Sequence, residues 1–170
     1  AYCARVSNPD NQLNTETSEK LVKYLMKHKH WSPLEMVSAC LEIETTRDIA
    51  RQILRHRSFS FQEFSQRYAN PTERQLKWQE KQETVIREAY QAYTWAIENG
   101  IAKEQARAVL PEGNTVSKMY VNGTLRSWIH YIELRGANGT QKEHIEIAHA
   151  VADVIADIFP LAEEYKGKEI

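Results

Sequence analysis

The segment 37–43 constrains the fold most, because its apolar residues alternate one by one with serine, cysteine and glutamate. This period of two predicts a strand that buries one face. The segment 45–55 follows at once with apolar residues at helical spacing, after a Thr45 and Asp48 pair that resembles a capping box. A strand that leads directly into a helix indicates a fold that mixes the two kinds of element.

Apolar residues return at helical spacing in several other parts of the chain, with Pro or Gly near their ends. A weaker pattern predicts a second strand over 115–121 with a turn at Asn122-Gly123, and the aromatic segment 58–71 is expected to be an ordered loop. The fold class is therefore α+β, with helices packed around a small, mainly antiparallel sheet. The other predicted helices are 18–30 with Thr15 or Thr17 as its cap, 73–98 with Leu76, Ile86, Ala89, Tyr90, Tyr93 and Ile97 on one side, 103–109, 125–135, and a last helix from a capping box at Thr140 and Glu143 to Ile158.

Composition limits the class of protein. With 170 residues, 42% of them apolar, residues 1–170 suit a single domain with its own core. Basic and acidic residues number 22 and 23, which argues against a globally basic nucleic-acid binder. Cys3 and Cys40 suit a reducing compartment and are expected to be inert packing residues, so a cytoplasmic location is the default. The sequence opens on Ala1, and we expect a short N-terminal piece to be missing.

An arginine cluster stands out from this neutral background. Between residues 47 and 67 there are five arginines and two acids, a local net charge of +3. Several guanidinium groups at helical spacing could converge on one phosphate. The alternative is a solvated helix face whose cations offset the helix dipole. Interleaved aromatic residues favour a pocket for a flat heterocycle with a phosphate. The arginines are Arg47, Arg51, Arg55, Arg57 and Arg67, and the aromatics are Phe59, Phe61, Phe64 and Tyr68.

Within this cluster, Arg55-His56-Arg57 followed by seven residues and Ser65 resembles the signature of the flavin-dependent thymidylate synthases. Similar residues occur in family order along essentially the whole chain. They are Ala4-Arg5-Val6-Ser7, Leu25-Met26-Lys27-His28, His30, Ser32-Pro33, Ala50-Arg51-Gln52, Glu63, Arg67-Tyr68, Ala106-Arg107, Val109-Leu110-Pro111, Leu125-Arg126-Ser127, Leu134-Arg135, Gln141 and Glu143.

The resemblance implies an enzyme that converts dUMP to dTMP, with methylene-tetrahydrofolate as the carbon donor and NADPH as the reductant acting through FAD. It also implies a homotetramer with sites between subunits and no cysteine nucleophile. No metal site is expected from the sequence. Arg135 is the expected catalytic residue, since a guanidinium stays charged and can stabilise an ionised pyrimidine. His30 is expected near the flavin or the folate. The residues implied for dUMP are Gln52, Arg55, Glu63, Ser65, Gln66, Arg67, Arg107 and Arg135. The residues implied for FAD are Ser32, Arg55, His56, Arg57, Glu63, Thr124, Leu125, Arg126 and His130.

Other functions stay open at this point. The arginine and aromatic segment could bind single-stranded nucleic acid, with phosphates on the arginines and bases on the rings. An inactive descendant that retains FAD is a further alternative, because Thr124 and Gly139 depart from residues common in the family. Glu146 and His149 have the spacing of di-iron ligands, but no second such motif accompanies them, so a solvated helix face is favoured.

Overall fold

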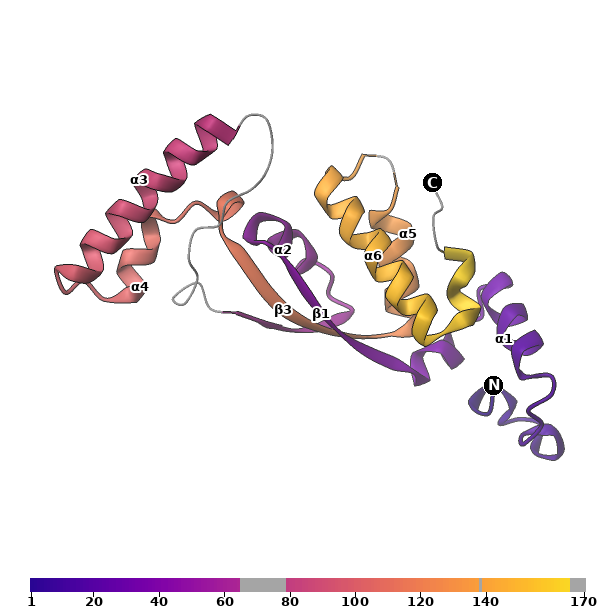
Figure 1. The fold of residues 1–170 in the computed structure, drawn as a ribbon. Coiled ribbons are helices and arrows are strands. Elements are labelled where there is room, and N and C mark those ends of the chain that lie inside the picture. Colours follow the sequence, from indigo (N-terminus) through magenta and orange to yellow (C-terminus); the bar gives the residue numbers. More distant parts are fainter. Residues whose placement is uncertain (65–78, 138, 166–170) are drawn as a thin grey trace. The chain divides into compact units, whose positions relative to one another are not determined.

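The structure is a computed structural model that describes residues 1–64, 79–137 and 139–165. The chain forms two compact units. We refer to residues 1–40 with 122–170 as the terminal unit and to residues 41–121 as the central unit. A three-stranded antiparallel sheet in the order β1-β3-β2, together with helices, makes the fold α+β, as predicted (Figure 1).

The long strands β1 (Ser38–Thr46) and β3 (Val116–Thr124) are neighbours in the sheet, with β3 as its central strand, and lie side by side in Figure 1. Arg47 N donates to Thr115 O at one end of the pair, at 2.9 Å, and Leu125 N donates to Val37 O at the other, at 2.8 Å. Side chains alternate between a buried and an exposed face along β1, which confirms the strand predicted over 37–43. The buried residues of the two strands are Leu41, Ile43, Thr46, Ser117, Met119, Val121 and Gly123.

The third strand, β2 (Phe59–Glu63), lies where an ordered loop was expected, so that prediction was wrong for these residues. Phe59 is buried while Ser60 and Gln62 are exposed, which is the period of two of a strand. Residues 65–71 of the expected loop lie outside the described residues. The turn predicted at Asn122-Gly123 was also wrong, because both residues belong to β3.

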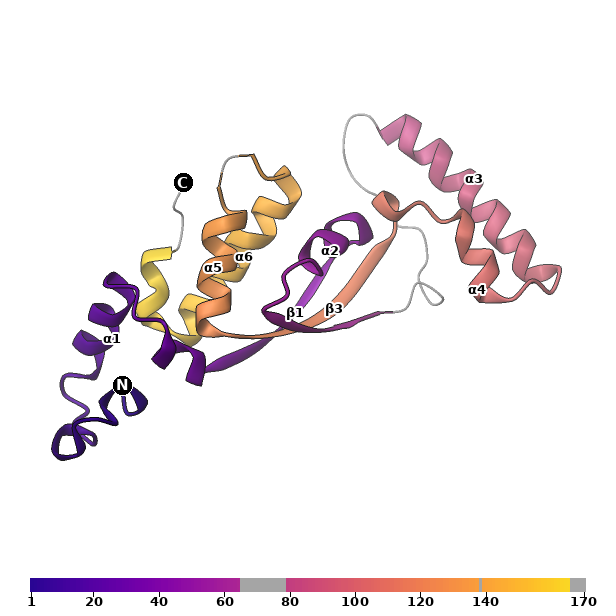
Figure 2. The same cartoon turned by 180° about the vertical axis from the view of Figure 1, so that it is seen from behind.

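The terminal unit is built from α1 (Ser18–Lys27), α5 (Leu125–Arg135) and α6 (Lys142–Ile158), with short 3-10 helices at Cys3–Arg5, Pro9–Asn11, Ser32–Met36 and Pro160–Tyr165. Figures 1 and 2 both show α5 and α6 side by side. Their facing apolar residues form the core of this unit. These residues are Leu125, Trp128, Ile129, Ile132, Ala148, Val151, Ala152, Ile155 and Ala156.

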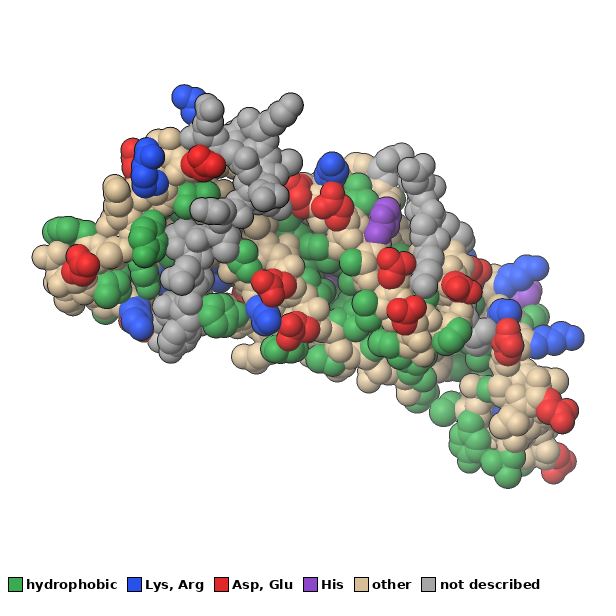
Figure 3. All heavy atoms as spheres, viewed as in Figure 1, with side chains coloured by type: hydrophobic (Ala, Val, Ile, Leu, Met, Phe, Trp, Pro, Cys, Tyr) green, Lys and Arg blue, Asp and Glu red, His purple; other side chains and the backbone are tan. Residues whose placement is uncertain are grey.

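The outer face of α6 is solvated. Glu146, Asp153 and Asp157 of this helix are exposed, and Figure 3 shows acidic side chains gathered over it. Among the described residues, no group of three or more His, Cys, Asp or Glu side chains is placed to hold a metal ion. The described part of the chain also holds no helix that is long and apolar enough to cross a membrane.

The central unit carries α2 (Arg47–Ile53), α3 (Gln79–Glu98) and α4 (Lys103–Ala106), with 3-10 helices at Arg107–Val109 and Glu112–Asn114. Ile49, Ala50 and Ile53 make the buried face of α2. The predicted stop after α3 is confirmed, because Gly100 takes a φ of 75°, which favours glycine. Of the apolar side predicted for α3, Leu76 lies outside the described residues, and Tyr90 is 50% exposed and therefore does not belong to it.

Several predicted helix ends differ from the structure. The helix predicted over 18–30 ends at Lys27, because Lys29 adopts a left-handed φ of 58°. The expected capping boxes do not form, since α2 begins after Thr46 and α6 after Gln141, and neither side chain makes a capping hydrogen bond. The prediction that Cys3 and Cys40 are packing residues was wrong, because both are exposed. The helix predicted over 125–135 is confirmed at both ends.

Candidate functional site

The expected site residues fall into two groups, one in each unit. The central unit holds the signature residues together with Gln52, Glu63 and Arg107, and the terminal unit holds the residues around α5 together with His30 and Ser32. Ser65, Gln66 and Arg67 lie outside the described residues. Each group is described within its own unit below.

The signature residues directly follow the end of α2. Gln52 is half-buried in the last turn, and the helix ends at Ile53, so Arg55 and Arg57 lie beyond it and are exposed. His56 is half-buried, with its ring 6.2 Å from that of Phe59 in an edge-on contact. The expectation that arginines four residues apart share one helix face up to Arg55 was therefore wrong, because the helix ends two residues before Arg55.

Two of the clustered arginines pair with carboxylates inside the central unit. The Arg47 side chain is only 7% exposed, and its Nη1 lies 3.5 Å from Oε1 of Glu63. Its Nε lies 3.7 Å from Oε1 of Glu112, and Nε of Arg51 lies 3.3 Å from the same oxygen. These two arginines are therefore partly neutralised within the protein, which argues against their being among the several guanidinium groups expected to converge on one anion.

Glu63 ends β2 and faces the buried side of β3. Ser117 Oγ donates to Glu63 Oε1 at 3.0 Å, and the Glu63 side chain is 17% exposed. The carboxylate is thus fixed from two sides and still reaches solvent. A carboxylate in this position can accept hydrogen bonds from hydroxyl or N–H donors of a bound molecule.

Arg107 begins the 3-10 helix at Arg107–Val109 and is half-buried. Its Nε donates to the carbonyl oxygen of Glu104 at 3.3 Å, which fixes the stem of the side chain. A guanidinium anchored at Nε still presents its Nη groups as donors for an anion.

In the terminal unit, the start of α5 gathers several expected flavin residues. Thr124 is the N-cap, and its Oγ1 accepts a hydrogen bond from Ser127 N at 3.2 Å. Leu125 is buried and anchors the helix in the core. Arg126 is partly exposed and forms an ion pair with Glu35 from the 3-10 helix at Ser32–Met36. Ser32 begins that same short helix and is exposed.

One helical turn further along α5, His130 is exposed and meets Trp31 edge-on, with ring centroids 5.1 Å apart. Sequence reasoning named neither Trp31 nor Glu35. The available signal was their position on either side of Ser32-Pro33, a pair that already resembled the family. The segment 31–35 thus contributes a hydroxyl, a carboxylate and an aromatic ring beside the start of α5.

His30 is exposed and follows α1 in the same unit. Tyr24 lies 6.0 Å from the His30 ring and stacks on His28 with ring centroids 4.0 Å apart. His30 is thus part of a small aromatic group at the end of the helix. No described contact joins it to the residues around α5.

Arg135 is the last residue of α5 and is half-buried, a position in which the helix dipole favours a cation. The anchor of this end of the helix is Tyr131, whose Oη lies 3.0 Å from Nε2 of His144 on α6. Burial raises the pKa of the Tyr131 phenol, and the charge of Arg135 opposes that rise. Arg135 therefore projects from a helix end that is tightly held by the core.

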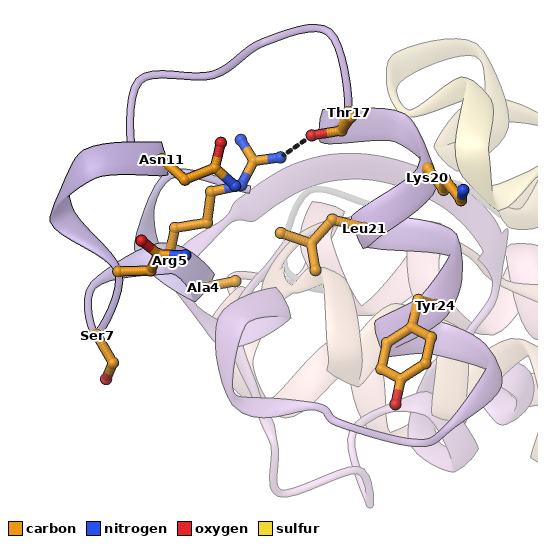
Figure 4. A pocket seen from close by; sticks show the side chains of 9 residues that line it. Ala4, Arg5, Ser7, Asn11, Thr17, Lys20, Leu21 and Tyr24 are labelled. Carbon is orange, nitrogen blue, oxygen red and sulfur yellow. Dashed lines mark hydrogen bonds between the residues drawn. The ribbon is translucent and has the colours of Figure 1, made fainter.

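A cavity of about 470 Å³ lies in the N-terminal part of the terminal unit. In Figure 4 the Arg5 guanidinium points across this region to Thr17, whose Oγ1 accepts a hydrogen bond at 2.8 Å. Arg5 also donates to Asn14 O, so its charge ties the N-terminal segment to the start of α1. Of the expected site residues that the structure describes, none lines this cavity.

Comparison with known proteins identifies the class. A family model described as thymidylate synthase complementing protein (Thy1) matches residues 1–161. The chain belongs to this family.

Curated relatives are similar over nearly the whole chain. A protein of Paramecium bursaria Chlorella virus 1 named "Probable flavin-dependent thymidylate synthase" is 45% identical over 185 residues, which covers 94% of this chain and 85% of the relative. The "Flavin-dependent thymidylate synthase" of Synechocystis sp. is 46% identical over 184 residues, covering 94% of this chain and 84% of the relative. A protein of the same name from Thermus thermophilus is 33% identical over 182 residues, which covers 94% of this chain and 67% of the relative.

Proposed function

We propose that this chain is a flavin-dependent thymidylate synthase, which methylates dUMP to dTMP with methylene-tetrahydrofolate as the carbon donor and NADPH as the reductant through FAD. The observation that carries the proposal is identity of 45% and 46% to proteins of that name over 94% of the chain. The family match over residues 1–161 supports the same assignment. The enzyme is expected to act in the cytoplasm.

The central unit supplies the proposed dUMP residues. Gln52, Arg55 and Arg107 offer an amide and two guanidinium groups for the base and the phosphate, with Ser65, Gln66 and Arg67 of the signature segment as further ligands. Glu63 supplies a carboxylate acceptor held by Ser117 at 3.0 Å.

The terminal unit supplies donors that suit FAD. Ser32, Thr124 and Arg126 provide two hydroxyls and a cation suited to a pyrophosphate, and Leu125 gives the backbone its fixed position. His130 with Trp31 at 5.1 Å provides an imidazole beside an aromatic ring, which suits a flat heterocycle. His56, Arg57, Arg55 and Glu63 of the central unit complete the proposed set, and His30 is proposed near the flavin or the folate. When bound, FAD supplies the redox chemistry that the side chains lack.

Arg135 is the proposed catalytic residue. A guanidinium can stabilise negative charge that develops on the pyrimidine at N3 but does not serve as a base. Anchoring of α5 through Tyr131 and His144 holds this charge in one place, and preorganised charge stabilises a transition state without reorganisation. The site residues lie in two units of one chain, and we propose that the active form is a homotetramer whose sites draw on more than one subunit.

The test is tritium release from dUMP labelled at C5, with FAD, NADPH and methylene-tetrahydrofolate each omitted in turn. Release that needs every component, and that falls by roughly 100-fold or more in Arg135→Ala with only partial recovery in Arg135→Lys, is expected. A matched control is Arg87→Ala, an exposed arginine on α3 outside the proposed site. Release that is unaffected by omitting FAD would contradict the proposal.

A further inference from the structure

Arg47 is a buried cation to which the proposed function assigns no role. It is the first residue of α2, where the positive end of the helix dipole disfavours a cation. Its side chain is only 7% exposed, so its charge has also lost most of its hydration. Two unfavourable terms at one residue call for compensating partners, and the structure gives two carboxylates, Glu63 and Glu112.

The contacts of Glu63 show what this arrangement holds in place. Arg47 Nη1 lies 3.5 Å from Glu63 Oε1, and Ser117 Oγ donates to the same oxygen at 3.0 Å. Ser117 is fully buried on the inner face of β3, where its neighbours Met119 and Val121 are apolar. A buried hydroxyl in an apolar row is favourable only when it is hydrogen-bonded, and its partner here is the Glu63 carboxylate.

Both of these contacts fall on Oε1, and the side chain of Glu63 is 17% exposed. The carboxylate is therefore held through Oε1 while part of the side chain still reaches solvent. An oriented, ionised carboxylate can select a hydroxyl or N–H donor of a ligand, whereas a mobile one would first have to be ordered. Glu112 lies 3.7 Å from Arg47 on its other side and balances the charge, so that Arg47 does not fully neutralise Glu63.

We propose that Arg47 and Ser117 are positioning residues that fix the carboxylate of Glu63 for its ligand. The inference rests on the proposed function, because that function assigns Glu63 to the nucleotide and the flavin. Arg47 and Ser117 act through Glu63 and do not touch the ligand. Arg47 comes from α2 and Ser117 from β3, so a helix and the sheet together carry the positioning.

The experiment measures the dissociation constants of FAD, by flavin fluorescence, and of dUMP, by the change in flavin absorbance, on the full chain. The variants are Arg47→Met, Arg47→Lys, Ser117→Ala, Glu63→Gln and the double variant Arg47→Met with Glu63→Gln. Lys118→Met is the matched control, since Lys118 is also a cation paired with glutamates on this sheet, at 3.0 Å from Glu42, but on the exposed face.

Arg47→Met is expected to weaken binding of at least one of the two ligands by roughly 10-fold, the usual effect of removing a residue that orients a ligand-binding group. Ser117→Ala is expected to weaken the same ligand by about 5-fold, and Arg47→Lys to recover part of the loss. The double variant is expected to bind no more weakly than Glu63→Gln alone, because Arg47 acts through Glu63. Lys118→Met is expected to bind as the wild type does.

The outcomes separate the two proposals. If the wild-type chain bound neither FAD nor dUMP, the proposed function would fail and this inference with it. If the wild type bound both, and the folded Arg47 and Ser117 variants bound with unchanged affinity, this inference alone would be overturned. Additive losses in the double variant would overturn it as well. Should Arg47→Met not fold, Ser117→Ala decides, since it removes one hydroxyl and little volume.

Discussion

The buried hydrogen bond between Tyr131 and His144 is expected to anchor the end of α5 that carries Arg135. Tyr131 is 1% exposed and His144 is 0% exposed, and the bond between them measures 3.0 Å. Tyr131→Phe removes only the hydroxyl, so ring packing is preserved and the loss is confined to the polar contact. The substitution therefore probes the contacts of one buried hydroxyl, among them the bond that joins α5 and α6.

The expected cost follows from these values. Loss of the hydrogen bond itself should cost about 1 kcal/mol of unfolding free energy. A second cost of about 1 kcal/mol arises because the buried Nε2 of His144 loses this partner. Tyr131→Phe should therefore lower the free energy of unfolding by about 2 kcal/mol, which corresponds to a fall in Tm of about 5 °C for a chain of this size. Tyr90→Phe is the matched control, because Tyr90 is 50% exposed, and it should change stability by less than about 0.5 kcal/mol.

The assay is urea unfolding followed by circular dichroism, with Tyr131→Phe, His144→Leu and the double variant measured in one cycle. Replacement of both partners by apolar groups should cost less than the two single losses together, with a coupling of about 1 kcal/mol or more. If the single losses added to within about 0.3 kcal/mol, the two rings would not be coupled and the reasoning would be refuted.

Four further predictions follow from single contacts. Gly136→Ala would place a methyl group 2.9 Å from a backbone oxygen and should cost about 1–3 kcal/mol in thermal unfolding; an unchanged Tm would contradict this. Thr124→Val removes the cap of α5 and should cost about 1 kcal/mol, whereas Thr124→Ser should retain most of the stability. Burial raises the pKa of Tyr131, so above about pH 10 this phenol ionises in the unfolded state but not in the folded state. The free energy of unfolding of the wild type should therefore fall with rising pH more steeply than that of Tyr131→Phe, by up to about 1.4 kcal/mol per pH unit. Equal pH slopes of the unfolding free energy in the two proteins would argue against it. Glu35→Gln frees Arg126 and should weaken FAD binding by up to about 5-fold in fluorescence titration, and tighter binding would show that the pair competes with the flavin.

Local signals predicted much of the fold. The strand over 37–43 and the helix over 125–135 were predicted correctly because their apolar periods are clean and their ends carry caps or breaks in the pattern. The strand at Phe59–Glu63 was missed, although its aromatics alternate with polar residues, because Ser, Asn and Pro in the segment 58–71 and the lack of a helical period indicated a loop. The prediction of a turn at Asn122-Gly123 was wrong because strand pairing across the sheet overrides the local turn preference of these two residues.

The candidate site was less readable, because its contacts join residues that are distant in sequence. Glu63 and Ser117 are 54 positions apart, and Arg126 and Glu35 are 91 apart. No local period encodes such pairs. Arg47 was grouped with the arginines expected to bind a phosphate, with a solvated helix face as the alternative, and its burial against two carboxylates depends on partners that only the folded chain brings near. Assignment of residues to dUMP and FAD came from family resemblance, and those assignments stay predictions.

The measurement that tests the central claim most directly is transfer of a labelled carbon. The full chain is incubated with dUMP, FAD, NADPH and methylene-tetrahydrofolate that carries carbon-13 in its methylene group. The nucleotides are then separated, and their masses are measured by mass spectrometry. The account predicts dTMP with carbon-13 in its methyl group, formed only when FAD and NADPH are present. Flavin that NADPH reduces without any labelled dTMP would contradict it, and would favour a protein of this family that binds FAD but no longer methylates.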